Sequence, residues 1–295
     1  AGAAAAELSD SSTFSSLADA IEADALDAVL LATPGRLHLP DLMAAIEAGL
    51  PTLCEKPLTP DPESALQVVE AEVAAGRTLI QVGFMRRFDP GYMELRDIIQ
   101  SRPYGELLAL RCQHRNPGVP EGYTDDMLIN DSVVHEIDVV RFLTDSPIVA
   151  VEVKNLKRNA NNFAHLNDPI LVFLETESGV IADVEMNVSV RFGYQVKTEA
   201  VFESGIAEIG RTSGTTVWQD GRYSGAEHTS FKTRFASAFE NELQRWVNAA
   251  KVGTIDGPSA WDGYLVAAAC AAGTTAQTTG ERVPVSYAVK PDLYL

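Results

Sequence analysis

Three short apolar segments alternate with two helical segments in the first part of the chain, and this order restricts the possible folds more than any other feature. The strand-like segments are 27–34, 50–54 and 78–83, and the helical segments are 38–48 and 60–75. Gly49 and Gly76 follow the two helices as stop signals. Strands that alternate with helices through short connections are typical of a parallel sheet covered by helices. We therefore predict an α/β domain at the start of the chain.

Each of the three predicted strands ends in a polar turn. The turns are Thr33-Pro34, Glu55-Lys56-Pro57 and Phe84-Met85-Arg86-Arg87. Ligands of parallel sheets bind beyond the carboxyl ends of the strands, and these ends lie along one edge. The sequence therefore predicts that the three turns converge on one binding rim.

The pattern changes after a further helical segment at 89–101. Strand-like segments follow at 107–113, 148–155, 169–175, 179–188 and 194–203, with a weaker candidate at 215–219, and helices are expected at 131–144, 229–251 and 260–279. The turn signals Glu177-Ser178-Gly179 and Asp220-Gly221 favour hairpins between some of these strands. We predict a first domain over 1–86 and an α+β domain over 87–295 with an open, mostly antiparallel sheet. Its C-terminal helices are candidates to pack back on the first domain.

The helix expected at 131–144 carries a histidine between two acidic residues. Asp131 and His135 are four residues apart, so they share one helix face, and Asp138 lies three residues further on nearly the same side. A carboxylate that holds one imidazole nitrogen leaves the other nitrogen free to exchange a proton near neutral pH. The spacing predicts an oriented acid/base pair, with a helix of two solvated acids and a structural histidine as the alternative.

Other candidate binding groups lie at strand ends. Lys56 on the rim is placed to stabilise negative charge on a substrate oxygen, although an exposed turn lysine is an equal alternative. His114 and Asn116 are placed to hydrogen-bond a polyhydroxylated ligand, with solvation of the strand end as the alternative. For Arg86 and Arg87 we expect one to bind a ligand and the other to pair with an acid.

Composition excludes several classes of protein. The formal net charge is −18, which argues against binding a nucleic-acid backbone. The cysteines Cys54, Cys112 and Cys270 are far apart and indicate reduced thiols in a cytoplasmic protein. No segment resembles a signal peptide or approaches the roughly 18 apolar residues of a membrane helix. No group of side chains has metal-ligand spacing, so we expect no metal.

Taken together, the motifs resemble the sugar- and inositol-dehydrogenase family related to glucose–fructose oxidoreductase. The residues that carry the resemblance are Ala32-Thr33-Pro34 with His38, Cys54-Glu55-Lys56-Pro57, and Asp131, His135 and Asp138 in that order. A closer likeness to bacterial myo-inositol 2-dehydrogenases rests on 82–89, 114–117, 134–138, 193–194, 257–264 and 290–291. The resemblance covers essentially the whole chain.

The resemblance implies NAD-dependent oxidation of a ring secondary alcohol of a cyclic polyol, with myo-inositol as the expected substrate and 2-keto-myo-inositol as the product. His135 would be the general base, Asp131 would orient it and contact the substrate, and Lys56 would bind the reacting oxygen. Further residues match positions at the substrate pocket: Met85, Arg86, His114, Asn116 and Tyr194. Others match the nicotinamide side of the cofactor site: Ala32, Thr33, Pro34, His38 and Glu55, with Lys56.

Two departures from the family pattern leave alternatives open. Phe192 stands where close relatives often have tyrosine, which favours testing other inositol isomers and sugars as substrates. No Gly-x-Gly-x-x-Gly turn occurs near the start, and the acid that reads the adenosine ribose is not found either. We expect that the first strand, helix and second strand of a Rossmann-type domain precede this chain. The choice of NAD over NADP as cofactor then rests on the resemblance alone. A third hypothesis is that the chain is a non-catalytic remnant that binds a sugar or a partner but no dinucleotide.

The strands of the second domain also predict an assembly. In 169–175 both alternating sets of residues are apolar, so we expect both faces of the sheet to be covered. The simplest cover is the sheet of a neighbouring subunit, which predicts a homotetramer with two-fold axes. We expect Leu171 and Val172 to lie at outward positions, and the alternative is that the C-terminal helices cover both faces.

Overall fold

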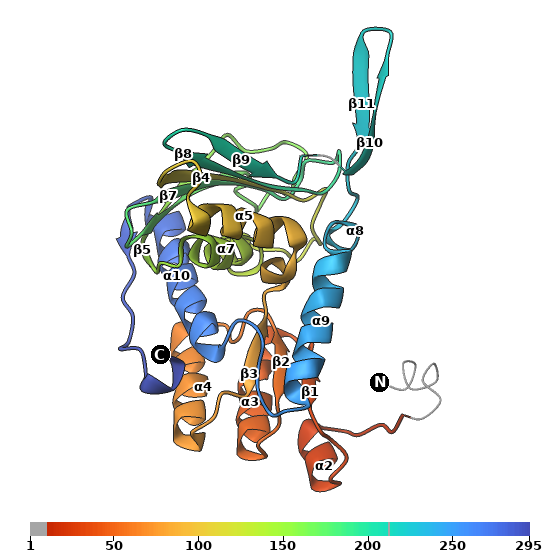
Figure 1. Cartoon of the computed structure of the whole chain (residues 1–295), viewed down its shortest axis with the longest axis vertical. Coiled ribbons are helices and arrows are strands. Elements are labelled where there is room, and N and C mark those ends of the chain that lie inside the picture. Colours follow the sequence, from red (N-terminus) through yellow and green to blue (C-terminus); the bar gives the residue numbers. More distant parts are fainter. Residues whose placement is uncertain (1–10, 212) are drawn as a thin grey trace.

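The structure is a computed structural model that describes residues 11–211 and 213–295. A small parallel sheet with its helices forms one end of the molecule, and a larger sheet lies across the other end (Figure 1). Helices α9 (Ala236–Ala250) and α10 (Ala260–Thr279) run between the two parts.

The first sheet has three parallel strands in the order β1-β2-β3, as the alternating pattern predicts. Its strands are β1 (Val29–Leu31), β2 (Thr52–Glu55) and β3 (Ile80–Gly83), and its helices are α2 (Leu17–Glu22), α3 (His38–Glu47) and α4 (Pro62–Ala75). Asp61 accepts a hydrogen bond from the Ser64 amide at the start of α4, and Gly76 ends that helix with a left-handed φ of 67°. The ends of the three strands therefore lie along one edge, where the polar turns begin.

The second sheet has seven strands in the order β12-β5-β6-β7-β4-β8-β9. The strands are β4 (Leu107–Arg115), β5 (Ile148–Asn155), β6 (Ile170–Thr176), β7 (Ile181–Asn187), β8 (Gln195–Phe202), β9 (Ile206–Ile209) and β12 (Val283–Pro284). The β4–β7 pair is parallel and the other pairs are antiparallel. The predicted open and mostly antiparallel sheet is confirmed.

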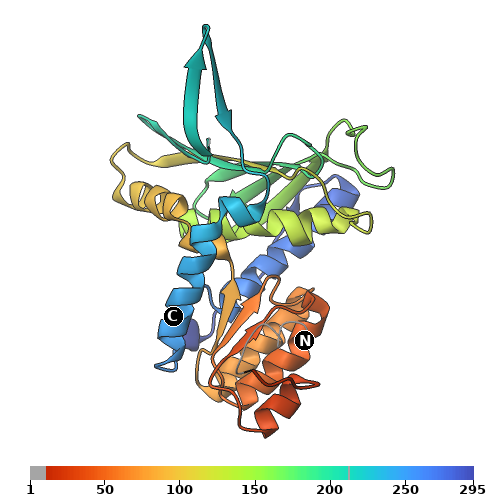
Figure 2. The ribbon, with the colours of Figure 1, turned by 90° about the vertical axis from the view of Figure 1, so that its right-hand side faces the viewer.

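A separate hairpin, β10 (Ser213–Gln219) and β11 (Arg222–Ala226), stands away from this sheet (Figure 2). Asp220 and Gly221 form its turn with φ angles of 51° and 71°, the conformation that the Asp-Gly signal predicts.

The inner face of the large sheet packs on helices α5 (Pro90–Ser101) and α7 (Val134–Thr144). Short elements connect the remaining parts: η1 (Gly35–Leu37), η2 (Met85–Phe88), α6 (Asp125–Met127), η3 (Leu128–Val133), α8 (Phe231–Arg234) and η4 (Asp292–Tyr294). The single helix predicted over 229–251 is divided into α8 and α9 at Phe235. Phe235 is fully buried against the Arg86 guanidinium and the Tyr194 ring, so tertiary packing interrupts a helical sequence pattern here.

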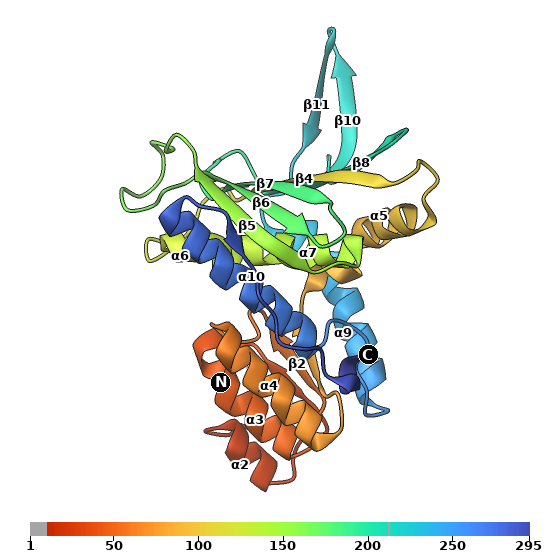
Figure 3. The same cartoon turned by 90° about the vertical axis from the view of Figure 1, so that its left-hand side faces the viewer.

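Helix α10 joins the two parts of the molecule. It contacts α4 and β3 on one side and β5 on the other (Figure 3). A Cβ atom at Gly263 would lie 2.8 Å from the Leu58 side chain, so glycine allows this close approach to the first domain. No helix within 11–211 or 213–295 is long and apolar enough to cross a bilayer.

One detail of strand β6 corrects the prediction from sequence. Val172 is fully buried on the inner face, whereas Leu171 lies half-buried on the outer face. Adjacent residues of a strand point to opposite faces, so the two cannot both be outward positions. Leu171 is the outward residue of the pair.

Candidate active site

A cavity of about 600 Å³ opens where the rim of the first sheet meets helix α7 and the large sheet. Its lining contains eight residues predicted from the sequence: Glu55, Lys56, Met85, His114, Asn116, Asp131, His135 and Tyr194. It also contains residues that the sequence reading missed: Pro117, Gly118, Ser132, Thr229, Ser230, Phe231 and Phe239. The rim prediction is therefore confirmed for the turns that follow β2 and β3.

Lys56 reaches from the end of β2 to the segment before α7. Its ammonium donates to Asp131 Oδ1 at 2.6 Å and to the Asp131 backbone carbonyl at 3.0 Å. The Lys56 side chain is 18% exposed and that of Asp131 is 45% exposed. This pair joins the two parts of the molecule at the cavity and holds a positive charge at the cavity wall.

His135 lies in the first turn of α7 and is 8% exposed. Its Nδ1 is buried without a hydrogen-bond partner among the described residues. Burial is the first cause that holds the pKa of His135 well below its usual range, and the positive charges of Lys56 and Arg86 add to it. The imidazole is therefore neutral at physiological pH and able to accept a proton.

The expected contact between Asp131 and His135 is not observed. Asp131 belongs to η3, a π-helical turn, and its carboxylate accepts from Lys56. The 3.6-residue spacing used in the sequence argument does not hold across this turn. Asp131 thus positions Lys56, and no hydrogen bond from the described residues orients His135.

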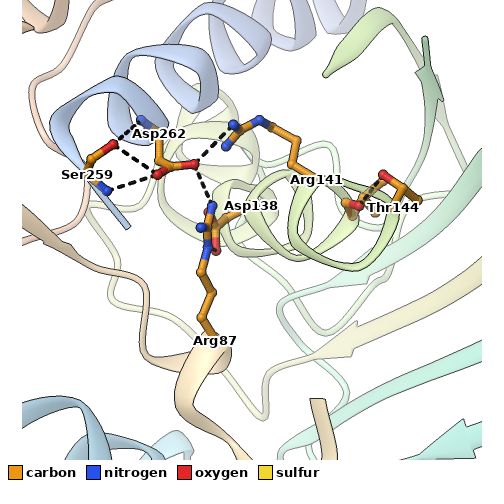
Figure 4. A network of polar contacts seen from close by, with 7 residues as sticks. Arg87, Asp138, Arg141, Thr144, Ser259 and Asp262 are labelled. Carbon is orange, nitrogen blue, oxygen red and sulfur yellow. Dashed lines mark hydrogen bonds and ion pairs between the residues drawn. The ribbon is translucent and has the colours of Figure 1, made fainter. Parts of the chain in front are cut away.

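Asp138 also departs from expectation, because it faces away from the cavity. Its carboxylate accepts three hydrogen bonds from Arg87, at 3.0, 3.0 and 2.6 Å, and its side chain is 1% exposed. Arg87 also donates to Asp262 at 3.0 Å, and Arg141 donates to the same Asp262 oxygen at 3.1 Å (Figure 4). The reading of this helix as carrying two solvated acids is wrong for Asp138.

Arg86 lies behind the cavity and does not line it. The guanidinium is 1% exposed and forms an ion pair with Glu136, and His114 Nδ1 lies 3.0 Å from the second Glu136 oxygen. Burial opposes ionisation of Glu136, but Arg86 and His114 together lower its pKa to about 2. Both arginines after β3 therefore pair with acids, whereas we expected one of them to bind a ligand. Glu136 was missed, because a glutamate in a helix usually indicates a solvated face.

Two further cavity residues are placed for hydrogen bonding or shape. Asn116 Oδ1 is buried without a partner among the described residues, so an acceptor is free at the cavity wall. The Tyr194 ring packs edge-on against the His114 ring, with centroids 5.9 Å apart. Phe192, by contrast, is 60% exposed and lies outside the cavity lining. The substrate alternative that Phe192 suggested has no support in this site.

The residues predicted for the cofactor divide into two sets. Pro34 lines a second hollow of about 560 Å³ that adjoins the first cavity and shares Asp131 with it. Ala32 and Thr33 are exposed and line neither hollow. His38 is fully buried, with Nε2 2.7 Å from the Thr33 carbonyl and Nδ1 3.0 Å from the Pro57 carbonyl. His38 therefore fixes the turns after β1 and β2, and its ring is too deeply buried to touch a ligand.

No metal centre is formed by the part of the chain that the structure describes. Within residues 11–211 and 213–295, no group of three or more histidine, cysteine or acidic side chains is arranged to hold a metal ion.

Comparison with known proteins gives concordant matches along the chain. Residues 1–84 match the GFO/IDH/MocA family model described as "Oxidoreductase family, NAD-binding Rossmann fold". Residues 92–208 match the model described as "GFO/IDH/MocA C-terminal domain". An inositol 2-dehydrogenase of Corynebacterium glutamicum is 55% identical over 295 residues, which are 100% of this chain and 87% of the relative. An inositol 2-dehydrogenase of Leifsonia xyli is 54% identical over 293 residues, 99% of this chain and 86% of the relative.

Among solved structures, the myo-inositol dehydrogenase of Lactobacillus casei in complex with NAD(H) and myo-inositol has a TM-score of 0.93 and 30% sequence identity. The match covers 97% of this chain and 85% of that chain. The arrangement of both sheets is therefore shared with a structurally characterised relative.

Proposed function

We propose a function from the premise that this chain belongs to the GFO/IDH/MocA family of NAD-binding oxidoreductases. It is an NAD-dependent dehydrogenase that oxidises a ring secondary alcohol of a cyclic polyol. The substrate is myo-inositol and the product is 2-keto-myo-inositol, as the names of relatives at 54% and 55% identity support.

The observation that carries this proposal is a neutral, unpartnered histidine in the same cavity as a lysine ammonium. His135 and Lys56 both line the cavity, and the cavity lies at the carboxyl ends of parallel strands. Alcohol oxidation needs a base for the hydroxyl proton and a positive group near the oxygen while it carries negative charge. His135 and Lys56 supply these two groups.

The residues present fit the nicotinamide side of NAD. The hollow lined by Pro34, Gly35 and Pro57 adjoins the substrate cavity, so these residues would hold the nicotinamide next to that cavity. A bound NAD would supply the hydride acceptor that oxidation of the alcohol requires. The pyrophosphate-binding turn and the ribose-reading acid are not found in this sequence, so the preference for NAD over NADP rests on the family.

Two side chains of the protein act on the reacting hydroxyl oxygen of the substrate. His135 takes the hydroxyl proton, and the Lys56 ammonium donates a hydrogen bond to the same oxygen as it becomes a carbonyl. The 2.6 Å hydrogen bond to Asp131 Oδ1 supports a role of Asp131 in holding the ammonium in place. Asn116 Oδ1 accepts from a neighbouring substrate hydroxyl, and Glu136 fixes the His114 ring at the cavity wall.

Steady-state oxidation of myo-inositol with NAD tests the function directly. Wild type should turn over, and the His135→Ala variant should lose about 10²–10⁴-fold in kcat. His165→Ala is the matched control, because His165 is an exposed histidine outside the cavity, and it should keep wild-type kinetics. Activity confined to scyllo-inositol, glucose or other polyols would refute the substrate, and near-normal turnover by His135→Ala would refute the mechanism. Turnover by the wild type also excludes the non-catalytic remnant.

We also propose that the enzyme is a homotetramer in which the large sheets of paired subunits pack face to face. Leu171 and Phe173 lie half-buried on the outer face of β6, and this apolar character in a central strand supports contact with a second sheet. Sedimentation equilibrium should give the tetramer mass. Leu171→Asp should lower that mass, whereas Arg77→Asp at the exposed end of α4 in the first domain (Figure 1) should leave it unchanged. A single monomeric species of wild type would refute the assembly.

A cytoplasmic location is part of the same proposal. Cys54, Cys112 and Cys270 are all buried as free thiols, which suits a reducing compartment. Cell fractionation with a cytoplasmic marker tests it.

A further inference from the structure

A second polar cavity of about 410 Å³ lies at the C-terminal end of α7, whereas His135 lies in the first turn of that helix. Its walls come from α5, the C-terminal turn of α7, the first turn of α10 and the segment 287–294. It shares no lining residue with the substrate cavity or with the adjoining hollow. None of the residues assigned to catalysis above reaches it.

The charge of this cavity is positive in a protein of net charge −18. Four cationic side chains line it, namely Arg87, Arg96, Arg141 and Lys290, together with the two carboxylates Asp145 and Asp262. Asp138 lies behind the wall and is already paired with Arg87. Among residues 11–211 and 213–295, neither Arg96 nor Lys290 takes part in an ion pair.

Arg141 is buried but only partly hydrogen-bonded. It is 9% exposed, and its Nη2 donates to Asp262 at 3.1 Å. Its Nε and Nη1 are buried without a hydrogen-bond partner among the described residues. Asp262 cannot supply both, because its oxygens already accept from Arg87 and from Ser259 at the start of α10 (Figure 4). Buried guanidinium N–H groups are normally hydrogen-bonded, so the Arg141 guanidinium lacks acceptors that a ligand could supply.

We propose that this cavity binds a small phosphate monoester, with the phosphate on Arg141, Arg96 and Lys290. A tetrahedral phosphate dianion supplies several hydrogen-bond acceptors and neutralises more than one cation. A single carboxylate supplies fewer acceptors and only one negative charge. Arg141, Arg96 and Lys290 all line this volume, so their positive charges surround the position proposed for the phosphate. The rings of Phe142, Trp261 and Tyr287 line the remaining volume, so the organic part of the ester packs against aromatic surface.

Trp261 provides a reporter inside the cavity itself. The chain has three tryptophans, so a Trp218→Phe, Trp246→Phe background leaves Trp261 as the single emitter. Inorganic phosphate is titrated against this protein at low ionic strength, with acetate as the carboxylate comparison. The proposal expects a saturable change in emission with phosphate, and binding of acetate at least about tenfold weaker.

Variants in the same background locate the binding. Arg141→Gln should weaken phosphate binding about tenfold or more, because one charge-assisted contact is lost. Arg96→Gln and Lys290→Gln should each weaken it severalfold, and these side chains form no ion pair on which folding would depend. Arg222→Gln, the same charge change on the exposed hairpin, should leave the affinity unchanged.

Each contrary result overturns a stated part of the proposal. The absence of a saturable change in emission, or unchanged affinity in both Arg96→Gln and Lys290→Gln, overturns the site even if Arg141→Gln does not fold. Equal affinity for acetate and phosphate overturns the phosphate assignment. Neither result depends on turnover, so failure here is separable from failure of the dehydrogenase function.

Discussion

The Lys56–Asp131 pair at the cavity and the Arg86–Glu136 pair behind it have the same chemistry but differ in their access to water. Asp131 is 45% exposed, whereas Arg86 and Glu136 are 1% and 2% exposed. Water can replace either partner of the first pair, but it cannot reach the second. The exposed pair is therefore available for the proposed reaction, whereas the buried pair stabilises the fold.

The largest effect on stability is expected when one member of the buried pair is removed. Arg86→Met leaves the Glu136 carboxylate buried without its cation and should reduce the free energy of unfolding by about 3–5 kcal/mol. Chemical denaturation measures the change. The double variant Arg86→Met, Glu136→Leu should recover most of it, because no charge is left buried. If the single variant is as stable as wild type, the two pairs do not differ as argued.

Lys56→Met tests the other side of the comparison. It should lower kcat by about 10²–10³-fold, since the charge beside the reacting oxygen is lost. Stability should change by less than about 1 kcal/mol, because the pair is partly solvated. Parallel kinetics and denaturation separate the two effects, with Lys251→Met as an exposed control. A stability loss as large as that of Arg86→Met would contradict the assigned roles.

The two regions should also differ in their dependence on pH. Burial lowers the pKa of His135, so unfolded chains bind a proton near pH 6.5 that the folded protein does not, and stability should fall as the pH drops below 6.5. The pKa of Glu136 is about 2, so its contribution is present above about pH 4.5 and is lost as the pH falls toward 2. Denaturation across pH should show both losses, and His135→Asn should remove the first. Because the pKa of His135 is lowered, His135 should still be an unprotonated base below pH 6.5, and kcat/KM should not yet fall there. A decrease of kcat/KM with a midpoint at pH 6.5 would argue against His135 as the base.

The smallest effect is expected at Asn116. Its Oδ1 has no partner among the described residues and is proposed to accept one neutral hydrogen bond from the substrate. Asn116→Ala should therefore raise KM for myo-inositol about 3–10-fold with little change in kcat. The variant removes a buried acceptor that has no partner within the described residues, so stability should not decrease. A large loss of kcat would place Asn116 among the groups that act on the reacting oxygen.

The sequence was sufficient to predict those site residues that follow from local pattern. Lys56 and Met85 come directly after strands of a parallel sheet, and the strand pattern alone brings their turns to one edge. His135 was found through its spacing from Asp131, although the π-helical turn changes what Asp131 contacts. A period of 3.6 residues cannot reveal such a turn.

The parts that escaped prediction depend on contacts between distant segments. Thr229 and Phe239 line the cavity, and the helical segment to which they were assigned is divided into α8 and α9 at Phe235. The division depends on packing of Arg86 against Phe235, a contact that the local sequence does not reveal. In the sequence, Glu136 cannot be distinguished from a solvated glutamate on a helix surface. Only its buried ion pair with Arg86 shows the difference. The domain boundary at residue 86 stays a prediction.

The Lys56–Asp131 contact has a consequence for how the enzyme is made. The two residues are 75 positions apart, and Lys56 lies in the turn after β2 whereas Asp131 lies in η3. Contacts of long sequence separation form late, after the loop between them has been closed. The strands of the first sheet pair over much shorter separations, so a newly synthesised chain would hold this sheet while it is still inactive. Catalysis would begin only when the first domain docks beneath α7.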